Sequence, residues 1–257
     1  MIDGTPLTEP MRILPLTGVA NFRDLGGYPT TDGGTTRWGR VFRADGLQQL
    51  TDEDVEVLRN LQLRTVIDLR TPDEVDQRGR YPIEAHPVTL HHLSVLDRTW
   101  DIEEARRDAL PPGEFLHRQY RSMLQENGDR YAAAVSLVAD QDSAPLVFHC
   151  AAGKDRTGLL AALVLGAVGV PRPTIIEDFA LTSVAMDKIM AEMRKDPERA
   201  AFLDEVPPSF FSADPIGMDR TLADVEDEHG SIREYLRRIG VKEIALAQLT
   251  QLLVEQP

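Results

Sequence analysis

The single cysteine of the chain lies in a segment whose residue types could cleave a phosphate ester. Cys150 follows the apolar run Leu146–Phe148 and precedes Arg156 by six residues. A thiolate is the nucleophilic form of cysteine. Inward-facing backbone N–H groups, the N-terminus of a following helix and an arginine would each favour that form. The same groups would bind a phosphate dianion and its transition state. We therefore predict that Cys150 attacks phosphorus and that Arg156 clamps the phosphate oxygens.

Other residues of this segment fit the same chemistry. Ala151 and Ala152 would offer backbone N–H groups, and Gly153 suits a backbone that approaches a ligand closely or has a positive φ. Thr157 could donate its hydroxyl to the cysteine sulfur, whereas His149 is expected to bond loop backbone rather than to act as a base. The alternative is an inert cysteine that ends a core strand, which leaves the Gly-Lys-Asp-Arg-Thr-Gly sequence unexplained.

These residues need a strand before them and a helix after them, and the sequence predicts both. Leu146–Phe148 reads as the central strand and Arg156–Val168 as the helix behind the loop. Further strands are expected at Val41–Ala44, Thr65–Leu69 and Val88–Leu93, and further helices at Thr51–Gln62, 113–126, 129–139, 219–228, 231–239 and 242–254. Strands that alternate with helices predict an α/β fold with a mostly parallel central sheet flanked by helices. An anion site belongs in the loop after a central strand of such a sheet.

Several of these segments carry a resemblance to a known family. His149–Gly158 resembles the active-site signature of the bacterial PtpB-like tyrosine phosphatases, an atypical branch of the cysteine-dependent protein tyrosine phosphatases. Asn21–Gly27, Val41–Arg43 and Val66–Arg70 resemble the N-terminal half of the same group, and the likeness runs from about residue 17 to 240. It implies a phosphotyrosine phosphatase with Cys150 as the nucleophile.

The identity of the general acid stays open between two aspartates. Ordinary tyrosine phosphatases carry the acid in a Trp-Pro-Asp loop, and this tripeptide does not occur here. The resemblance favours Asp155, inside the phosphate-binding loop. Asp68, at the end of a predicted strand, is the alternative because open α/β sheets build their sites at that edge. Asp155 could instead cap the helix, and Asp68 could pair with Arg70 or Arg43.

Lys154 bears on the substrate. A lysine four residues after the cysteine is similar to the loop of phosphoinositide phosphatases, where a second cation meets additional phosphates. The PtpB-like group is credited with phosphotyrosine, phosphoserine/threonine and phosphoinositide activity, and a solvated lysine on the loop rim is the alternative. We assign the substrate site to Ala151, Ala152, Gly153, Lys154, Thr157 and Asp68. The rival functions are a phosphoinositide phosphatase, an inactive phosphate-binding module and a sulfurtransferase.

The region 173–215 is expected to form a helical lid. Residues 173–205 have a helical pattern, with Met186, Met190 and Met193 along one face, and methionine stripes are usually core. The PtpB-like enzymes, however, carry a lid in this region, and the segment 207–211 could tip its aromatic side chains towards the active site. The sequence thus predicts one phosphatase domain over residues 1–257 with 173–215 as an inserted lid.

Composition limits the partners. The chain has 28 basic and 42 acidic residues, a net charge of −14, which argues against nucleic acid and leaves anion attraction to the local loop. One cysteine means no internal disulfide, which fits a reducing compartment. Residues 1–20 show no signal peptide, and the longest apolar run, Leu159–Val170, has 12 residues against the roughly 20 needed to span a bilayer. We expect a cytoplasmic protein, with leaderless secretion left open.

Neither a metal nor a cofactor is expected. His91 and His92 are adjacent on a predicted strand, so their side chains would face opposite sides of the sheet. Further ligands at a useful spacing are missing from the sequence around them.

Overall fold

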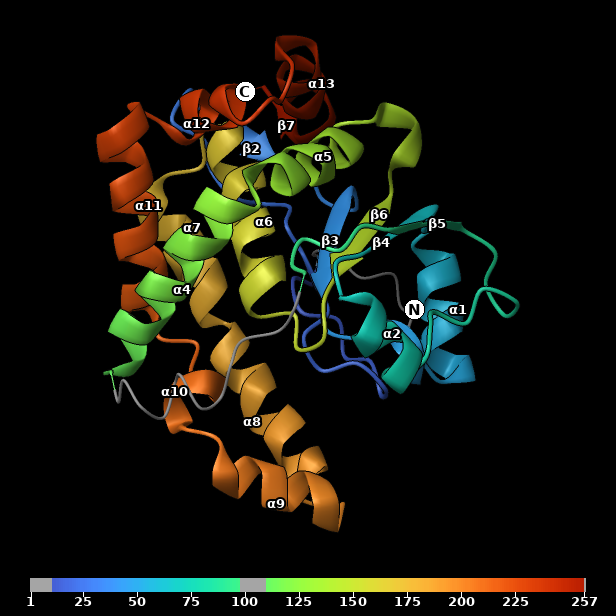
Figure 1. Cartoon of the computed structure of the whole chain (residues 1–257). Helices are drawn as coiled ribbons and strands as arrows, with labels where there is room; N and C mark the ends of the chain where they lie inside the picture. Colours follow the sequence, from blue (N-terminus) through green and yellow to red (C-terminus); the bar gives the residue numbers. More distant parts are fainter. Residues whose placement is uncertain (1–10, 98–109, 257) are drawn as a thin grey trace.

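The computed structural model describes residues 11–97 and 110–256, and a five-stranded sheet forms its centre (Figure 1). The strand order is β1 (Arg23–Asp24), β3 (Val41–Ala44), β6 (Leu146–His149), β4 (Thr65–Asp68) and β5 (Thr89–His92). β3, β6, β4 and β5 are parallel, and only β1 runs antiparallel to its neighbour β3. The predicted mostly parallel sheet is confirmed, with β6 in its middle.

The strands are buried on both faces because their side chains alternate between two apolar clusters. Phe148 and Ile67 belong to the larger cluster, whereas Val147 and Val66 belong to the smaller one. Successive side chains of a strand point to opposite faces, so an apolar run such as Leu146–Phe148 needs cover on both sides. Helices supply that cover.

The helices are divided unequally between the two faces (Figure 1). The smaller cluster lies under α1 (Asp52–Asn60), which begins with a capping box between Thr51 and Asp54. The larger cluster draws residues from α4 (Pro112–Glu126), α5 (Gly128–Val138), α6 (Asp155–Ala167), α7 (Arg172–Ala180), α11 (Pro215–His229), α12 (Ile232–Arg238) and α13 (Glu243–Leu253). The remaining short helices of the body are η1 (Leu47–Gln49), α2 (Pro72–Arg78) and η2 (Gln141–Ser143).

A second, two-stranded sheet joins the C-terminal segment to a segment near residue 35. β2 (Thr35–Thr36) pairs antiparallel with β7 (Val254–Glu255). The Gly- and Thr-rich segment 17–40 is consistent with short strands such as β2, but β7 was not predicted, because two residues are too short to show a periodic pattern. This pairing holds the last helix against the N-terminal quarter of the protein.

The predicted lid range 173–215 begins inside the core. Its first helix, α7, belongs to the core, where Ile175 and Phe179 are buried, so the expected start at 173 lies too early. The helices α8 (Thr182–Met193) and α9 (Pro197–Glu205) extend away from the sheet (Figure 1). The short helix α10 (Pro208–Phe211) returns to α4, and the rings of Phe210 and Phe115 lie 5.7 Å apart.

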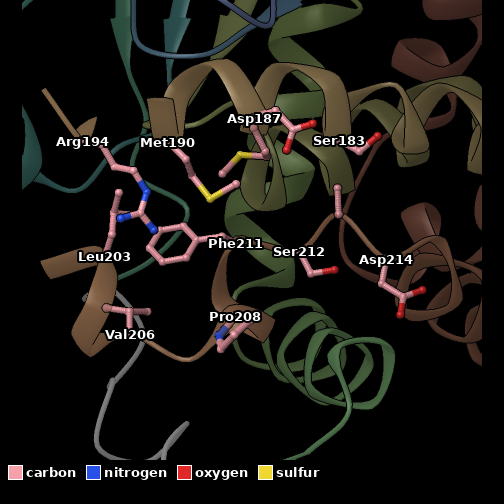
Figure 2. Close-up of a pocket in the computed structure, with 12 residues that line it drawn as sticks. Ser183, Asp187, Met190, Arg194, Leu203, Val206, Pro208, Phe211, Ser212 and Asp214 are labelled. Carbon is pink, nitrogen blue, oxygen red and sulfur yellow. The ribbon is translucent and has the colours of Figure 1, made fainter. Parts of the chain in front are cut away.

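A groove of about 460 Å³ separates α8, α9 and the segment 206–214 (Figure 2). Met186 is buried and Met190 is half-buried along the groove wall. Of these two methionines, only Met186 therefore fits the interpretation that the stripe packs in the core. Phe211 lines the groove and packs against Phe202, whose ring centre is 6.4 Å away. The aromatic rings of α10 thus pack against α4 and α9. Within the described residues, no helix is both long and apolar enough to cross a bilayer.

Candidate active site

Three strands bring their carboxyl ends to one edge of the sheet. Ala44 of β3 and Asp68 of β4 are both level with His149 of β6. The segments after these strands therefore meet, and Cys150 begins the middle one with only 2% of its surface exposed. We call residues 150–156 the phosphate loop.

Gly153 lets this loop pass close beneath the neighbouring strand. Its φ is +64°, and a Cβ atom added there would lie 2.5 Å from the carbonyl oxygen of Ala44. Any other residue would be strained in this conformation and would also collide with β3. On the same side, the N–H of Gly46 donates to the carbonyl of Ala151 at 3.1 Å.

Two side chains hold the next carbonyl groups of the loop outwards. Asn21 Nδ2 donates to the carbonyl oxygens of Ala152 and Gly153, both at 3.1 Å. Arg43 Nη2 donates to the Gly153 carbonyl at 2.8 Å. In a trans peptide the C=O and the following N–H point in opposite directions. The N–H groups that follow these carbonyls therefore face the inside of the loop, which is the arrangement predicted for an anion site.

Arg156 is held in place by a carboxylate that the sequence analysis does not identify. Its two Nη atoms donate to Glu74 on α2 at 2.5 and 2.8 Å, and both side chains are about nine-tenths buried. Burial would raise the pKa of Glu74, but Arg156 outweighs it and lowers this pKa to about 2. Burial would likewise lower the pKa of Arg156, whereas Glu74 and the nearby Cys150 raise it, so the guanidinium remains charged. The capping box of Thr71 with Glu74, which forms in the structure, is a sequence signal that could have indicated α2 and its buried glutamate.

Asp155 is the first residue of α6, and its carboxylate accepts one hydrogen bond and forms one ion pair. The hydroxyl of Tyr120 donates to its Oδ1 at 2.8 Å, and Lys154 Nζ lies 3.4 Å from the same oxygen. Lys154, not Asp155, occupies the N-cap position of α6. Lys154 is only 1% exposed, which contradicts the solvated-rim alternative, and its Nζ donates to the carbonyl oxygen of Phe210 at 2.5 Å. The lysine thus connects the phosphate loop to α10.

Asp68 pairs with Arg70, which is the structural role that was considered for Asp68 as an alternative to general acid. Arg70 Nε donates to its Oδ1 at 2.9 Å and Nη2 to its Oδ2 at 2.6 Å. Burial would raise the pKa of Asp68, but Arg70 outweighs it and lowers this pKa, so Asp68 is held ionised.

His149 contacts the carbonyl oxygen of Cys150 through Nδ1 at 3.2 Å, as predicted for a residue that bonds loop backbone. Among the described residues, Thr157 Oγ1 is buried without a hydrogen-bond partner.

Beneath the loop lies a cluster of buried charges. Arg23 Nε donates to Asp178 Oδ1 at 3.0 Å, and Arg43 Nη1 donates to Asp178 Oδ2 at 2.6 Å. Burial would raise the pKa of Asp178, but the two arginines lower it well below its usual range. Arg23 thus belongs to a buried ion-pair cluster, with Asp178 as its carboxylate partner. Asp178 carried no sequence signal because it lies in α7, outside any motif.

The comparison with known proteins decides the family. The model of the tyrosine phosphatase family matches residues 14–255. The chain belongs to this family. It is 27% identical to the triple specificity protein phosphatase PtpB of Mycobacterium tuberculosis, over 95% of this chain and 100% of the relative. It is 29% identical to a putative tyrosine-protein phosphatase of Cupriavidus necator, over 90% of this chain and 84% of the relative.

Among solved structures, the Siw14 catalytic core matches with a TM-score of 0.39 and 16% identity, over 75% of this chain and 95% of that one. The family assignment confirms the resemblance in His149–Gly158 and makes this tyrosine phosphatase family member a hydrolase of phosphomonoesters. Among the described residues, no group of His, Cys, Asp or Glu suited to a metal ion is found.

Proposed function

We propose that the protein hydrolyses phosphotyrosine in proteins through a phosphocysteine intermediate. The observation that carries the proposal is the shape of the phosphate loop. Its carbonyl groups are held outwards by Asn21 and Arg43, and its guanidinium is fixed by Glu74. Such a site offers N–H groups and a planar cation to the equatorial oxygens of a phosphoryl group.

In the first step, Cys150 Sγ attacks phosphorus and the bond from phosphorus to the tyrosine oxygen breaks. The leaving oxygen takes a proton from the general acid, and the phosphoryl group stays on sulfur. In the second step, water attacks the phosphocysteine, and the same residue accepts a proton from the water. Phosphate leaves and the thiolate is restored. Arg156 and the loop N–H groups would stabilise the charge on phosphorus in both steps. The unpartnered hydroxyl of Thr157 could donate to sulfur as it leaves.

We propose Asp155 as the general acid. Part of its side chain is exposed, 22%, and it adjoins the loop at the first residue of α6. Asp68 is held ionised by Arg70, and a carboxylate without a proton cannot supply one. In this proposal Asp68 holds the guanidinium of Arg70 in place and transfers no proton.

The leaving group distinguishes the two aspartates. With phenyl phosphate, a poor leaving group, we expect Asp155→Asn to lower kcat about 100-fold or more. With 4-nitrophenyl phosphate, whose leaving group needs little protonation, the loss should be much smaller. Asp68→Asn should reduce both rates by a similar factor. The opposite pattern would transfer the role of acid to Asp68.

A rapid-quench experiment tests the intermediate itself. The enzyme should release a burst of 4-nitrophenolate equal to the number of active sites and should carry covalently bound phosphate on Cys150. Cys150→Ser should abolish both, and orthovanadate should inhibit. Phosphate binding without any burst would identify an inactive phosphate-binding module instead.

The substrate class needs its own comparison. PtpB is called a triple specificity phosphatase, and a lysine at position 154 favours additional phosphates, so phosphoserine/threonine peptides and phosphoinositides are the second candidates. Lys154, however, is engaged by Phe210 and Asp155, which supports phosphotyrosine. Turnover of a phosphotyrosine peptide, the matching phosphoserine peptide and a phosphoinositide in vesicles should rank in that order. Because a free thiol must stay reduced, we place the reaction in the cytoplasm or another reducing compartment.

A further inference from the structure

Asp178 is a buried carboxylate whose bonds the proposed reaction does not use. It lies on α7 with 1% of its side chain exposed, and both of its oxygens are engaged. Oδ1 accepts from Arg23 Nε at 3.0 Å and from the Tyr28 hydroxyl at 2.9 Å, and Oδ2 accepts from Arg43 Nη1 at 2.6 Å. Buried ion pairs contribute little net stability, because desolvation offsets their attraction. Apolar side chains would fill this part of the core as well, so the cluster calls for another explanation.

Two routes lead from Asp178 to the phosphate loop. In the first, Arg43 binds Asp178 through Nη1 and the Gly153 carbonyl through Nη2, at 2.6 and 2.8 Å. In the second, Arg23 binds Asp178 and also donates to Asn21 Oδ1. The amide nitrogen of Asn21 in turn donates to the carbonyls of two loop residues at 3.1 Å. Every one of these side chains is at least nine-tenths buried, so water does not replace a lost contact easily.

We propose that Asp178 is a positioning residue for the phosphate loop. By fixing Arg43 and, through Arg23, Asn21, it holds the carbonyl groups of Ala152 and Gly153 outwards. The N–H groups that follow these carbonyls are then held towards the bound oxyanion. This inference deepens the proposed function and rests on the loop being its oxyanion site. It places a determinant of that site 28 residues after Cys150, at the root of the projecting helix α8.

Calorimetric titration with sodium tungstate tests the inference without any turnover. Asp178→Asn keeps the size of the side chain but removes the charge that both arginines need. We expect its tungstate Kd to rise about tenfold or more. Tyr28→Phe is the matched control. It removes a hydrogen bond to the same carboxylate, but this hydrogen bond is not part of either route to the loop. Its Kd should stay within about twofold of wild type.

A second variant covers the case in which Asp178→Asn does not fold. Arg43→Lys keeps a cation but cannot bridge Asp178 and Gly153 with two nitrogens. It should also weaken tungstate by about tenfold, and in the double variant with Asp178→Asn the two effects should not add, because both break one route. Thermal unfolding is measured alongside, since a purely structural role would lower Tm and leave Kd unchanged in the folded protein.

The outcomes separate this inference from the proposed function. If folded Asp178→Asn or Arg43→Lys binds tungstate as wild type does, the inference is overturned even when wild type hydrolyses phosphotyrosine. If wild type binds tungstate, the variants bind it weakly and no hydrolysis occurs, the inference stands and the proposed function fails. If wild type does not bind tungstate, both are overturned.

Discussion

Removing the carboxylate that holds Arg156 should cost the enzyme much of its rate. Glu74→Gln retains an oxygen that can accept from the Thr71 N–H, as Glu74 does at 2.8 Å. It loses the charge-assisted pair with Arg156, in which two contacts of 2.5 and 2.8 Å fix the plane of the guanidinium. Hydrogen bonds to charged groups contribute about 1.5–3 kcal/mol each. Without the Glu74 carboxylate, the Arg156 guanidinium is not held in position before the transition state forms. We therefore expect the variant to lose the free energy of about one such hydrogen bond to the phosphoryl group.

That loss corresponds to a fall of about 10- to 100-fold in kcat/KM. The assay is hydrolysis of 4-nitrophenyl phosphate, with the orthovanadate inhibition constant as a second measure of oxyanion binding. Asp73→Asn is the matched control, because Asp73 is an exposed acid in the same first turn of α2 and its loss changes the net charge equally. It should retain wild-type kinetics.

The stability of Glu74→Gln should also fall, by about 1–3 kcal/mol, because a buried arginine keeps only a neutral partner. Stability and rate are measured separately for this reason. If kcat/KM and the vanadate constant stay within about twofold of wild type while unfolding shifts, Glu74 serves the fold alone. The account of Arg156 as a preset phosphate clamp would then be wrong.

Further predictions follow from the same contacts. Because folding lowers the pKa of Glu74 from 4.5 to about 2, wild type should lose stability as the pH falls through that interval, and denaturant titrations should show a flatter profile for Glu74→Gln. Gly153→Ala should reduce kcat/KM at least tenfold through its collision with β3. Gly39→Ala should not, because its φ of +70° is equally unusual but its surroundings are open. Lys154→Met should speed chymotryptic cleavage within residues 182–212, since the contact with the Phe210 carbonyl is lost; unchanged cleavage would remove the lysine as a link to α10.

The central strand, its loop and the following helix could be predicted because their signals are local. The apolar run Leu146–Phe148 and the glycine-rich segment after it lie within a few residues of one another. The loop itself requires a glycine at 153, which sequence reasoning identified from the residue type. The strands β3, β4 and β5 and most of the longer helices were also predicted to within a few residues, whereas α2 and β7 were not predicted. These elements follow from periodicity, which needs no knowledge of how the chain packs.

The contacts that shape the site could not be predicted in the same way. Glu74 and Arg156 are 82 positions apart, and Arg43 and Asp178 are 135 apart. Pairing at such separations depends on how helices pack on the sheet, and one sequence does not reveal that. The capping box at Thr71 could have indicated α2, but it gives no sign that Glu74 also binds Arg156. The packing of α7 could not be predicted either. Its residues Ile175 and Phe179 belong to the core, although the lid was expected to start at 173.

The site therefore depends on the whole fold more than its motif suggests. A phosphate loop with free peptide groups would turn its carbonyl oxygens as readily as its N–H groups towards an anion. Holding the carbonyl groups outwards and the guanidinium in one position costs free energy. In this protein, the packing of α2 and α7 offsets that cost during folding, before any substrate binds. In a chain with a net charge of −14, this matters further, because the protein as a whole repels an anionic substrate. Attraction must come from groups whose direction is already set, and in our proposal the buried contacts of Glu74 and Asp178 set it.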